Sequence, residues 1–324
     1  MEIAEVLAEY KNELAEVESF MERHITSGIK LISEVAGHLI ASGGKRIRPL
    51  LHLISSQLCG YAGGERFPLA AAIEYIHTAT LLHDDVIDEA LVRRGKASAN
   101  VVWGNAVSVL VGDYLYSKAF SLLAETGDLR LIRLMSQMTN IMSEGEVFQL
   151  MKSGDANLTE EEYFSIVEKK TAVLISAACE SGAVMGQVDE GRAAALRNYG
   201  YKIGMAFQIV DDTLDYMATQ EDFGKAIGKD LEEGKMTLPL IYTLAHCLAA
   251  DREMVRAAIE KKELAPDVAG NIFTLIHKSG GIDYAMQRAD NFIREAAQEL
   301  EIFDDCRKKE ELLAVAAHVI ARKT

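Results

Sequence analysis

An all-α fold, built as one large helical bundle, is predicted by three features of the sequence. Apolar residues recur three or four positions apart along nearly the whole chain, as in Leu69, Ile73 and Ile76. Proline occupies only four of the 324 positions, so long segments lack the residue that most often interrupts a helix. Strand-like alternation of apolar and polar residues is scarce, which argues against a large sheet.

Short segments rich in glycine and capping residues separate the expected helices. These breaks lie at residues 42–44, 61–64, 95–98, 127–128, 154–159, 220–234 and 279–281. Helices of about 15 to 30 residues are expected between them, with apolar faces formed in chain order by Ile29, Ile32 and Leu39; Leu69, Ile73, Ile76 and Leu81; Leu131, Leu134, Met138 and Met142; and Leu196, Tyr199, Ile203 and Phe207. No repeat, low-complexity tract or linker is present, so we expect a single domain spanning residues 1–324.

Composition and charge narrow the class of protein. Hydrophobic residues make up 49% of the chain, enough for a large core, and the net charge of −15 argues against binding to nucleic acid or to anionic lipid. The acidic, helix-patterned start is unlike a secretory signal, and no apolar run is long enough to insert in a membrane. Four scattered cysteines, without CxxC spacing, fit reduced thiols better than disulfides or zinc ligands. A cytoplasmic protein is therefore expected.

Two clusters with the pattern Asp-Asp-x-x-Asp are expected near the ends of two long helices. Their members are Asp84, Asp85 and Asp88 in the first, and Asp211, Asp212 and Asp215 in the second. Residues four apart share a helix face, and two carboxylates about 4 Å apart repel by roughly 4 kcal/mol at an effective dielectric near 20. Oxygen ligands without His or Cys suit Mg²⁺. The simpler alternative, an exposed acidic helix end, is disfavoured by the apolar neighbours of both clusters.

Basic residues follow the same segments. Lys45 and Arg48 lie where a glycine turn leads into a helix with Pro49 in its first turn, which describes an anion site. The other basic residues near the clusters are Arg93, Arg94, Lys169, Lys170, Lys225, Lys229 and Lys235. Singly, each is more often a solvated surface residue. Beside two aspartate clusters in an acidic chain, they indicate diphosphate binding.

These motifs closely resemble those of the trans-isoprenyl diphosphate synthases, the polyprenyl synthetase family, and within it the long-chain synthases of the octaprenyl type. The resemblance runs from about residue 42 to residue 239, with looser similarity towards both ends. It rests on GGKRIRP at 43–49, EYIHTATLLHDDVIDEALVRRG at 74–95, GNAVSVLVGDYLYSKAF at 104–120, EGEVFQL at 144–150, KT at 170–171, FQIVDDTLDY at 207–216 and GKDLEEGKMTLPL at 228–240. Thr213 stands where the family usually has an aliphatic residue, at a position not expected to be a ligand.

The resemblance implies a bundle of the isoprenoid synthase type with a central product cavity, two to three Mg²⁺ ions and a homodimer, to which the helix around residues 112–120 could contribute. Asp84, Asp88 and Asp211 would bind the metal most directly, with Asp85, Asp212 and Asp215 in support. The roles implied for the other residues are isopentenyl diphosphate binding by Lys45, Arg48, His77 and Arg94, allylic diphosphate binding by Arg93, Lys170, Lys225 and Lys235, and proximity to the carbocation for Thr171 and Gln208. A lone His77 would otherwise be a packed core residue.

The implied reaction lengthens an allylic diphosphate, such as farnesyl diphosphate, by head-to-tail addition of isopentenyl diphosphate. It proceeds by metal-assisted ionisation, condensation and proton loss, with the released diphosphate as the expected base. The octaprenyl-sized product would supply quinone side chains. No Ser/His/Asp or Cys nucleophile is needed, and none is visible.

Product length is expected to depend on residues that precede the first cluster. Ala79 and Thr80 are small, whereas short-chain members of the family tend to place an aromatic residue there. Ile76 and Ile73 lie about one and two helical turns deeper. Met135, Met138 or Met142 could form the floor of a channel, although each methionine alone is more often ordinary core.

Three other functions remain open. A shorter-chain farnesyl or geranylgeranyl synthase would share every motif. A terpene cyclase or head-to-head synthase would not need GGKRIRP or Arg94, because it lacks the second, homoallylic diphosphate. A noncatalytic partner subunit would be expected to lose aspartates, and here all six are present.

Overall fold

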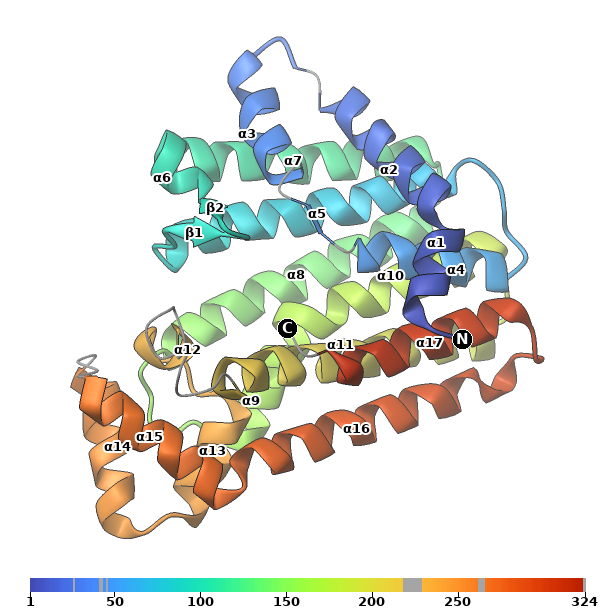
Figure 1. Ribbon diagram of the computed structural model, residues 1–324. Coiled ribbons are helices and arrows are strands. Elements are labelled where there is room, and N and C mark those ends of the chain that lie inside the picture. The colour runs from blue at the N-terminus through green and yellow to red at the C-terminus, as the bar shows by residue number, and fades with distance from the viewer. Residues whose placement is uncertain (26, 41–42, 45, 218–228, 262–265, 323–324) are drawn as a thin grey trace. The chain divides into compact units, whose positions relative to one another are not determined.

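The computed structural model describes residues 1–25, 27–40, 43–44, 46–217, 229–261 and 266–322 (Figure 1). Regular structure in these ranges is almost entirely helical. The strands among them are β1 (Val92–Arg93) and β2 (Lys96–Ala97), two residues each, which pair antiparallel as a small hairpin. The predicted all-α fold is confirmed.

The chain divides into two compact units. The first unit comprises Met1–Gln137, Ala177–Arg197 and Phe303–Leu312, and the second comprises Met138–Ser176, Asn198–Ile302 and Leu313–Thr324. The helices that contribute residues to both units are α8 (Leu129–Lys152), α10 (Val173–Gly186), α11 (Glu190–Met217) and α17 (Arg307–Ala321). The single domain over residues 1–324 stays a prediction.

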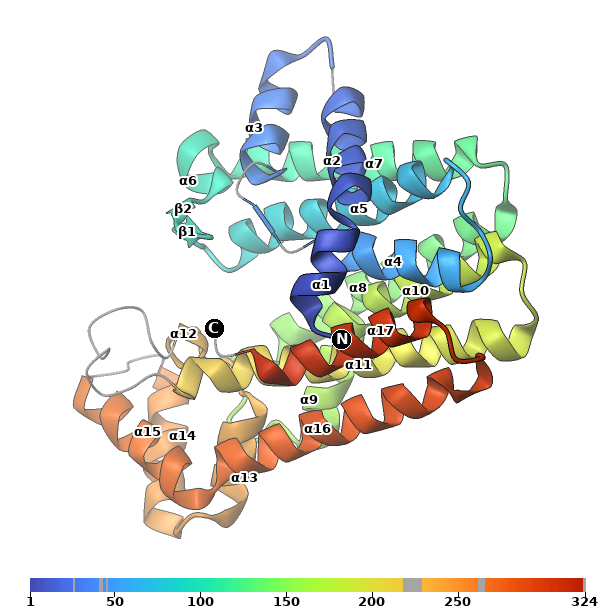
Figure 2. The ribbon, with the colours of Figure 1, turned by 45° about the vertical axis from the view of Figure 1, so that its right-hand side comes forward.

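The first unit is organised around a pair of long helices. Its own helices are α1 (Ile3–Glu9), α2 (Lys11–His24), α3 (Lys30–Ile40), α4 (Ile47–Leu58), α5 (Arg66–Ile87), α6 (Ala99–Trp103) and α7 (Asn105–Glu125). Helices α5 and α7 lie side by side, and α2 and α4 also pack on α5 (Figures 1 and 2). Ile73, Ile76 and Leu115 are fully buried between these helices, and each such side chain stabilises the unit by about 1.5–3 kcal/mol.

The second unit contains a group of helices near the C-terminal end of the chain. Its own helices are α9 (Glu160–Val167), the π-helix η1 (Glu168–Ala172), α12 (Lys229–Glu232), α13 (Leu238–His246), α14 (Ala249–Lys261), α15 (Pro266–Ser279), α16 (Gly281–Glu299) and the 3₁₀ turn η3 (Leu300–Ile302). Helix α13 packs against α15 and α16, as Figure 2 shows. Leu240, Ile276 and Ala285 are buried in these three helices.

Most predicted helix boundaries agree with the structure. Helix α5 begins at Arg66, and residues 127–128 separate α7 from α8. The break at 154–159 ends at Thr159, whose side chain caps α9 in a capping box with Glu162. The expected break at 220–234 is wrong in its described part, because Lys229–Glu232 forms the short helix α12. Residues 218–228 lie outside the described residues.

The expected length of 15 to 30 residues is wrong for several helices. Helices α4 and α13 have 12 and 9 residues. One unpredicted break is Gly104, whose φ of 86° ends α6 before α7 begins, a conformation that glycine adopts without strain. A pattern of apolar residues continues through such a break, so periodicity alone did not reveal it.

All four cysteines are free thiols. Helices long and apolar enough to cross a membrane do not occur among the residues that the structure describes.

A buried histidine joins two helices of the first unit. His52 of α4 is fully inaccessible, and its Nδ1 lies 2.7 Å from the hydroxyl of Ser181 on α10. Because that hydroxyl donates to the carbonyl of Ala178 at 2.8 Å, the ring nitrogen is the donor to Ser181. Nε2 of His52 is buried without a hydrogen-bond partner in the described part of the chain. Burial lowers the pKa of His52 to about 4.

The free energy of unfolding should therefore decrease at acidic pH, because His52 is protonated more readily in the unfolded protein. The folded state disfavours the proton that unfolded His52 takes up near its ordinary pKa, so stability is retained above about pH 6.5 and is lost as the pH falls towards 4. The loss amounts to about 3 kcal/mol at most. The measurement is urea unfolding of the wild type and of His52→Gln at several pH values. The difference in free energy of unfolding between the two proteins should be constant above pH 7. Below pH 6 the wild type should lose stability relative to His52→Gln, and a pH-independent difference would contradict the assignment.

Candidate active site

The first aspartate cluster lies at the C-terminal end of α5. Asp84 and Asp85 are in its last turn, and Asp88 is the C-cap, with its backbone N–H donating to the carbonyl of Asp84 at 2.8 Å. The C-terminal end of a helix carries a partial negative charge. Three carboxylates at such an end favour a bound cation.

Asp85 is fixed by the hairpin that follows the helix. Its side chain is fully buried, and Oδ1 accepts hydrogen bonds from Nε and Nη2 of Arg93 at 2.8 and 2.6 Å. Asn100 of α6 donates to the backbone carbonyl of Asp85 at 2.9 Å. Oδ2 of Asp85 is buried with no hydrogen-bond partner among the described residues. A buried carboxylate oxygen of this kind fits a further cation or donor.

Arginine side chains gather around His77 in the middle of α5. Partial burial of the ring, followed by the positive charges of Arg48 and Arg94, lowers the pKa of His77 well below its usual value. Arg94 adopts a left-handed conformation with φ of 51° in the turn of the hairpin. Its guanidinium lies so close to Gly44 that a Cβ at that position would be 2.9 Å from Nη1. Three of the residues predicted for one diphosphate thus converge, and Lys45, the fourth, lies outside the described residues.

Arg46 anchors the same glycine segment and was not predicted from the sequence. It is buried with φ of 46°, and its guanidinium bonds to Glu74 at 2.8 Å, Glu18 at 2.9 Å and the carbonyl of Ile40 at 2.8 Å. Because all three ends of the guanidinium contact protein acceptors, Arg46 holds the turn in place. In the sequence it is indistinguishable from its basic neighbours.

The second aspartate cluster belongs to α11 and is tied to α9 and η1. Gln208 donates from Nε2 to Oδ1 of Asp212 at 2.7 Å, and Tyr163 donates to Oδ2 at 2.6 Å. Thr171 in turn donates to Oε1 of Gln208 at 2.7 Å. Burial, and then the negative charge of Asp230, raise the pKa of Asp212 well above the usual range of a carboxyl group. This hydrogen-bonded chain fixes which way the Gln208 amide points.

The other two aspartates of the second cluster contact neighbouring groups. Arg322 lies 2.8 Å from Oδ1 of Asp211, with its guanidinium 4.4 Å from the centre of the Phe207 ring. The backbone N–H of Asp230 donates to Oδ2 of Asp215 at 3.2 Å. The pairing of Asp211 with Arg322 shows that this cluster attracts a cation.

Lys170 and Thr171 lie in the π-helical segment η1. π-Helical turns are rare and occur frequently at functional sites. A Cβ on Gly204 of α11 would be 2.4 Å from Cα of Ala172, so glycine permits the close approach of the two helices. Lys170 bonds to Glu146 of α8 at 3.1 Å, and Lys235 bonds to Glu233 at 2.5 Å. Lys225 lies outside the described residues.

The residues predicted to control product length are mostly in the interior. Ile76 and Ala79 of α5 are fully buried, and Thr80 is partly exposed. Met135, Met138 and Met142 of α8 are also buried. Burial is required of a channel wall and equally of ordinary core, so channel control stays a prediction.

The carboxylates of each cluster can be compared with the ligands that different metal ions prefer. No group of three or more His, Cys, Asp or Glu side chains converges to hold a metal by itself within the described ranges. Mg²⁺ keeps several waters and commonly binds through one or two carboxylates together with substrate phosphates. Carboxylate-only clusters with an available oxygen on Asp85 fit that ion better than a preformed zinc or calcium cage.

Several polar neighbours of the predicted residues were missed in the sequence. Glu146 and Asp230 lie inside motifs that were recognised, EGEVFQL and GKDLEEGKMTLPL, but no role was given to them. Tyr163 and Arg322 carry no local signal, because they reach Asp212 and Asp211 only through the fold.

Comparison with known proteins identifies the family. The polyprenyl synthetase family model matches residues 29–276. The chain is 38% identical over 310 residues to octaprenyl diphosphate synthase of Escherichia coli, with 96% of each protein covered. Among solved structures, a polyprenyl synthase from Caulobacter crescentus complexed with calcium and isoprenyl diphosphate has a TM-score of 0.94 at 38% identity, covering 99% of this chain and 98% of that one.

A decaprenyl diphosphate synthase from Rhodobacter capsulatus has a TM-score of 0.95 at 37% identity, covering 99% of both chains. The family match, the near-complete coverage and the presence of both aspartate clusters agree with one another. This chain is therefore a prenyltransferase that belongs to the polyprenyl synthetase family.

Proposed function

We propose that the protein is a long-chain trans-polyprenyl diphosphate synthase of the octaprenyl type, which adds isopentenyl diphosphate head-to-tail to an allylic diphosphate such as farnesyl diphosphate. The main support is that Arg48 and Arg94 lie near His77 in a chain that also has both aspartate clusters. A second diphosphate pocket of this kind is what head-to-tail addition needs. The similarity to the Escherichia coli octaprenyl synthase supports the product class, and the proposed use is in quinone side chains.

The residues around His77 would hold isopentenyl diphosphate. Guanidinium groups bind phosphate oxygens through two parallel hydrogen bonds, and Arg48 and Arg94 supply two such groups. The lowered pKa keeps the His77 ring neutral at pH 7, so the ring can donate or accept a hydrogen bond there. Lys45 would add a fourth contact.

The aspartates would hold two to three Mg²⁺ ions, directly through Asp84, Asp88 and Asp211 and with support from Asp85, Asp212 and Asp215. The metal, when bound, supplies positive charge that stabilises the departing diphosphate. Arg93, Lys170, Lys225 and Lys235 would bind the same allylic diphosphate through their charges.

Thr171 and Gln208 would lie near the carbocation that follows ionisation. Asp212 accepts a hydrogen bond from the Gln208 amide N–H, so Oε1 of Gln208 points to Thr171. The side-chain oxygens of Gln208 and Thr171 therefore lie next to each other. Oxygen dipoles of fixed direction stabilise positive charge without reorganising. By resemblance to the family, the proton lost after condensation would go to the released diphosphate.

We further propose a homodimer in the cytoplasm. Val101 and Val102 of α6 and Leu110 of α7 are large apolar residues exposed by about half or more, which supports a subunit contact on this face. The free state of all four cysteines supports a reducing compartment.

The decisive experiment is incubation of the purified chain with Mg²⁺, farnesyl diphosphate and labelled isopentenyl diphosphate, followed by mass analysis. An octaprenyl-sized product supports the proposal in full. A farnesyl or geranylgeranyl product would identify a shorter-chain synthase. A cyclised or head-to-head product would identify another class of enzyme, and the absence of turnover would identify a noncatalytic subunit.

Removal of a metal-binding carboxylate should abolish most turnover without unfolding the protein. We expect Asp84→Ala and Asp211→Ala to lower kcat at least about 100-fold, because each removes a ligand of the ion that stabilises the leaving group. Asp283→Ala, at an exposed position in the first turn of α16, is the control and should retain wild-type kcat. Near-normal turnover in either cluster variant would overturn the metal assignment.

An aromatic residue in place of Ala79 should shorten the product. The side chain of Ala79 is fully buried on α5, five residues before Asp84, so Ala79→Tyr would block a channel that passes it and yield farnesyl- or geranylgeranyl-sized product. Overpacking costs about 1–3 kcal/mol, so the thermal midpoint is measured as well. Ala124→Tyr at an exposed site of α7 is the control. Unchanged product length in a folded Ala79→Tyr protein would contradict the channel direction.

A further inference from the structure

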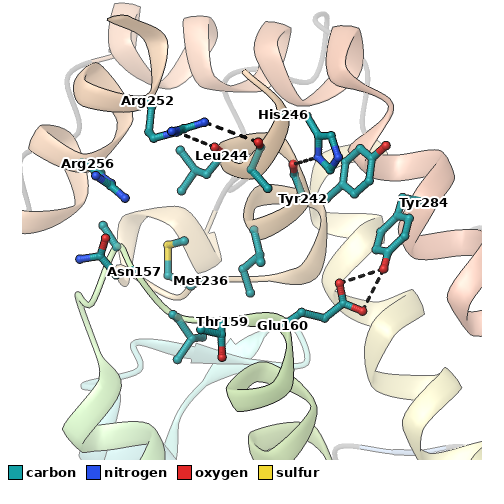
Figure 3. Close-up of a pocket in the computed structure, with 14 residues that line it drawn as sticks. Asn157, Thr159, Glu160, Met236, Tyr242, Leu244, His246, Arg252, Arg256 and Tyr284 are labelled. Atoms are coloured by element: carbon teal, nitrogen blue, oxygen red, sulfur yellow. Dashed lines mark hydrogen bonds between the residues drawn. The ribbon is translucent and has the colours of Figure 1, made fainter. Parts of the chain in front are cut away.

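The second unit contains a pocket whose described lining includes none of the residues predicted for prenyl transfer. Its volume is about 610 Å³, and it is formed by the segment before α9, the start of α9, helix α13, one face of α14 and Tyr284 of α16 (Figure 3). A cavity of this size can hold a small organic molecule.

Two arginines make the pocket positive. Arg252 and Arg256 are four residues apart and so share one face of α14. Arg252 is held in place by the carbonyls of Leu244 and Cys247 at 2.7 and 3.4 Å. Nε of Arg256 is buried with no hydrogen-bond partner in the part of the chain that the structure describes. No carboxylate in that part forms an ion pair with either arginine.

Glu160, the acid among the described residues that line the pocket, does not cancel this charge. Glu160 accepts hydrogen bonds from Tyr284 at 2.9 and 2.8 Å, and Arg288 lies 2.6 Å from it. Glu160 is therefore neutralised by Arg288, and two guanidinium groups remain in a chain whose net charge is −15. Such a site selects an anion.

The rest of the lining is apolar and aromatic. Met236, Ile241 and Leu244 supply buried apolar surface. Tyr242 stacks on His246 at 4.1 Å and on Tyr284 at 4.4 Å between ring centres. Figure 3 shows the two arginines on one side of the pocket and these rings on the other. A ligand with an anionic end and an apolar or aromatic body would satisfy both sides.

We propose that this pocket is an effector site for a small organic phosphate. The phosphate group bonds to Arg256 and to the free edge of Arg252, since guanidinium forks match phosphate oxygens, while the body of the ligand lies against Met236, Ile241 and the Tyr242 ring.

The pocket is lined by parts of two segments that also carry residues of the candidate active site. Met236 directly follows Lys235, and Glu160 begins α9, which carries the Tyr163 that donates to Asp212 at 2.6 Å. A ligand that contacts both segments biases the positions of Lys235 and Tyr163. This effect on turnover rests on the proposed function, whereas binding does not.

Binding is tested with phenyl phosphate on the full chain, by calorimetry in EDTA and without prenyl diphosphate. We expect saturable binding by the wild type and by Arg294→Gln, an arginine exposed on α16, and at least about tenfold weaker binding by Arg256→Gln, because one charged hydrogen-bonding group is lost. Circular dichroism and the thermal midpoint check that Arg256→Gln is folded. Equal affinity in the two variants, no saturation by about 10 mM, or tighter binding of benzoate than of phenyl phosphate overturns the proposal.

A second measurement locates the bound phenyl phosphate without changing any charged residue of the pocket. In ¹³C-methyl methionine spectra, assigned by Met236→Leu and Met205→Leu, phenyl phosphate should shift the Met236 signal and leave that of Met205, a buried residue of α11 that does not line the pocket. An unmoved Met236 signal at saturation contradicts the site.

The effector role is tested by turnover at a fixed, subsaturating allylic diphosphate. Added phenyl phosphate should change the rate of the wild type and of Arg294→Gln and leave that of Arg256→Gln unaltered. A change of the same size in all three proteins means that the probe acts elsewhere and overturns the effector role. If the chain has no turnover at all, the proposed function fails while the calorimetric result still decides the binding site.

Discussion

Repulsion among aspartates is the constraint on which the rest of the structure depends. Each Asp-Asp-x-x-Asp motif places carboxylates on neighbouring positions of a helix, and the first lies at a helix C-terminal end that is itself negative. Such an arrangement persists only where cations or hydrogen-bond donors offset it. The protein supplies some of these itself: Arg93 to Asp85, Arg322 to Asp211, and Tyr163 with Gln208 to Asp212.

The middle aspartate of each motif has a role different from its neighbours. Asp85 and Asp212 are buried and accept hydrogen bonds from protein donors, so each orients a neighbouring side chain, Arg93 in one unit and Gln208 in the other. The flanking aspartates are more accessible and suit a metal. Under the proposed function, each motif would combine flanking aspartates that bind metal with a middle one that positions neighbouring side chains, as metal sites generally require.

The sequence predicted the helical class and the members of both clusters, because helical periodicity and the Asp-Asp-x-x-Asp spacing are local features. It did not reveal Tyr163, Arg322 or Arg46, whose importance comes from partners far away in the chain, nor the break at Gly104 within an apolar run. The pocket beside Arg256 was also invisible, because its walls come from four separate segments. Spacing along one helix therefore predicts local structure and the members of a local motif, and it does not reveal contacts that the fold makes between distant residues.

The proposed function depends most on divalent ions that these aspartates would bind, and the number of bound ions can be counted directly. Mn²⁺ titration followed by electron paramagnetic resonance, in the presence of a nonreactive thio analogue of an allylic diphosphate, reports bound ions without turnover. More than one ion bound per chain in the wild type, with fewer in both Asp84→Asn and Asp211→Asn, is the predicted result. Binding that is unchanged in either variant would contradict it.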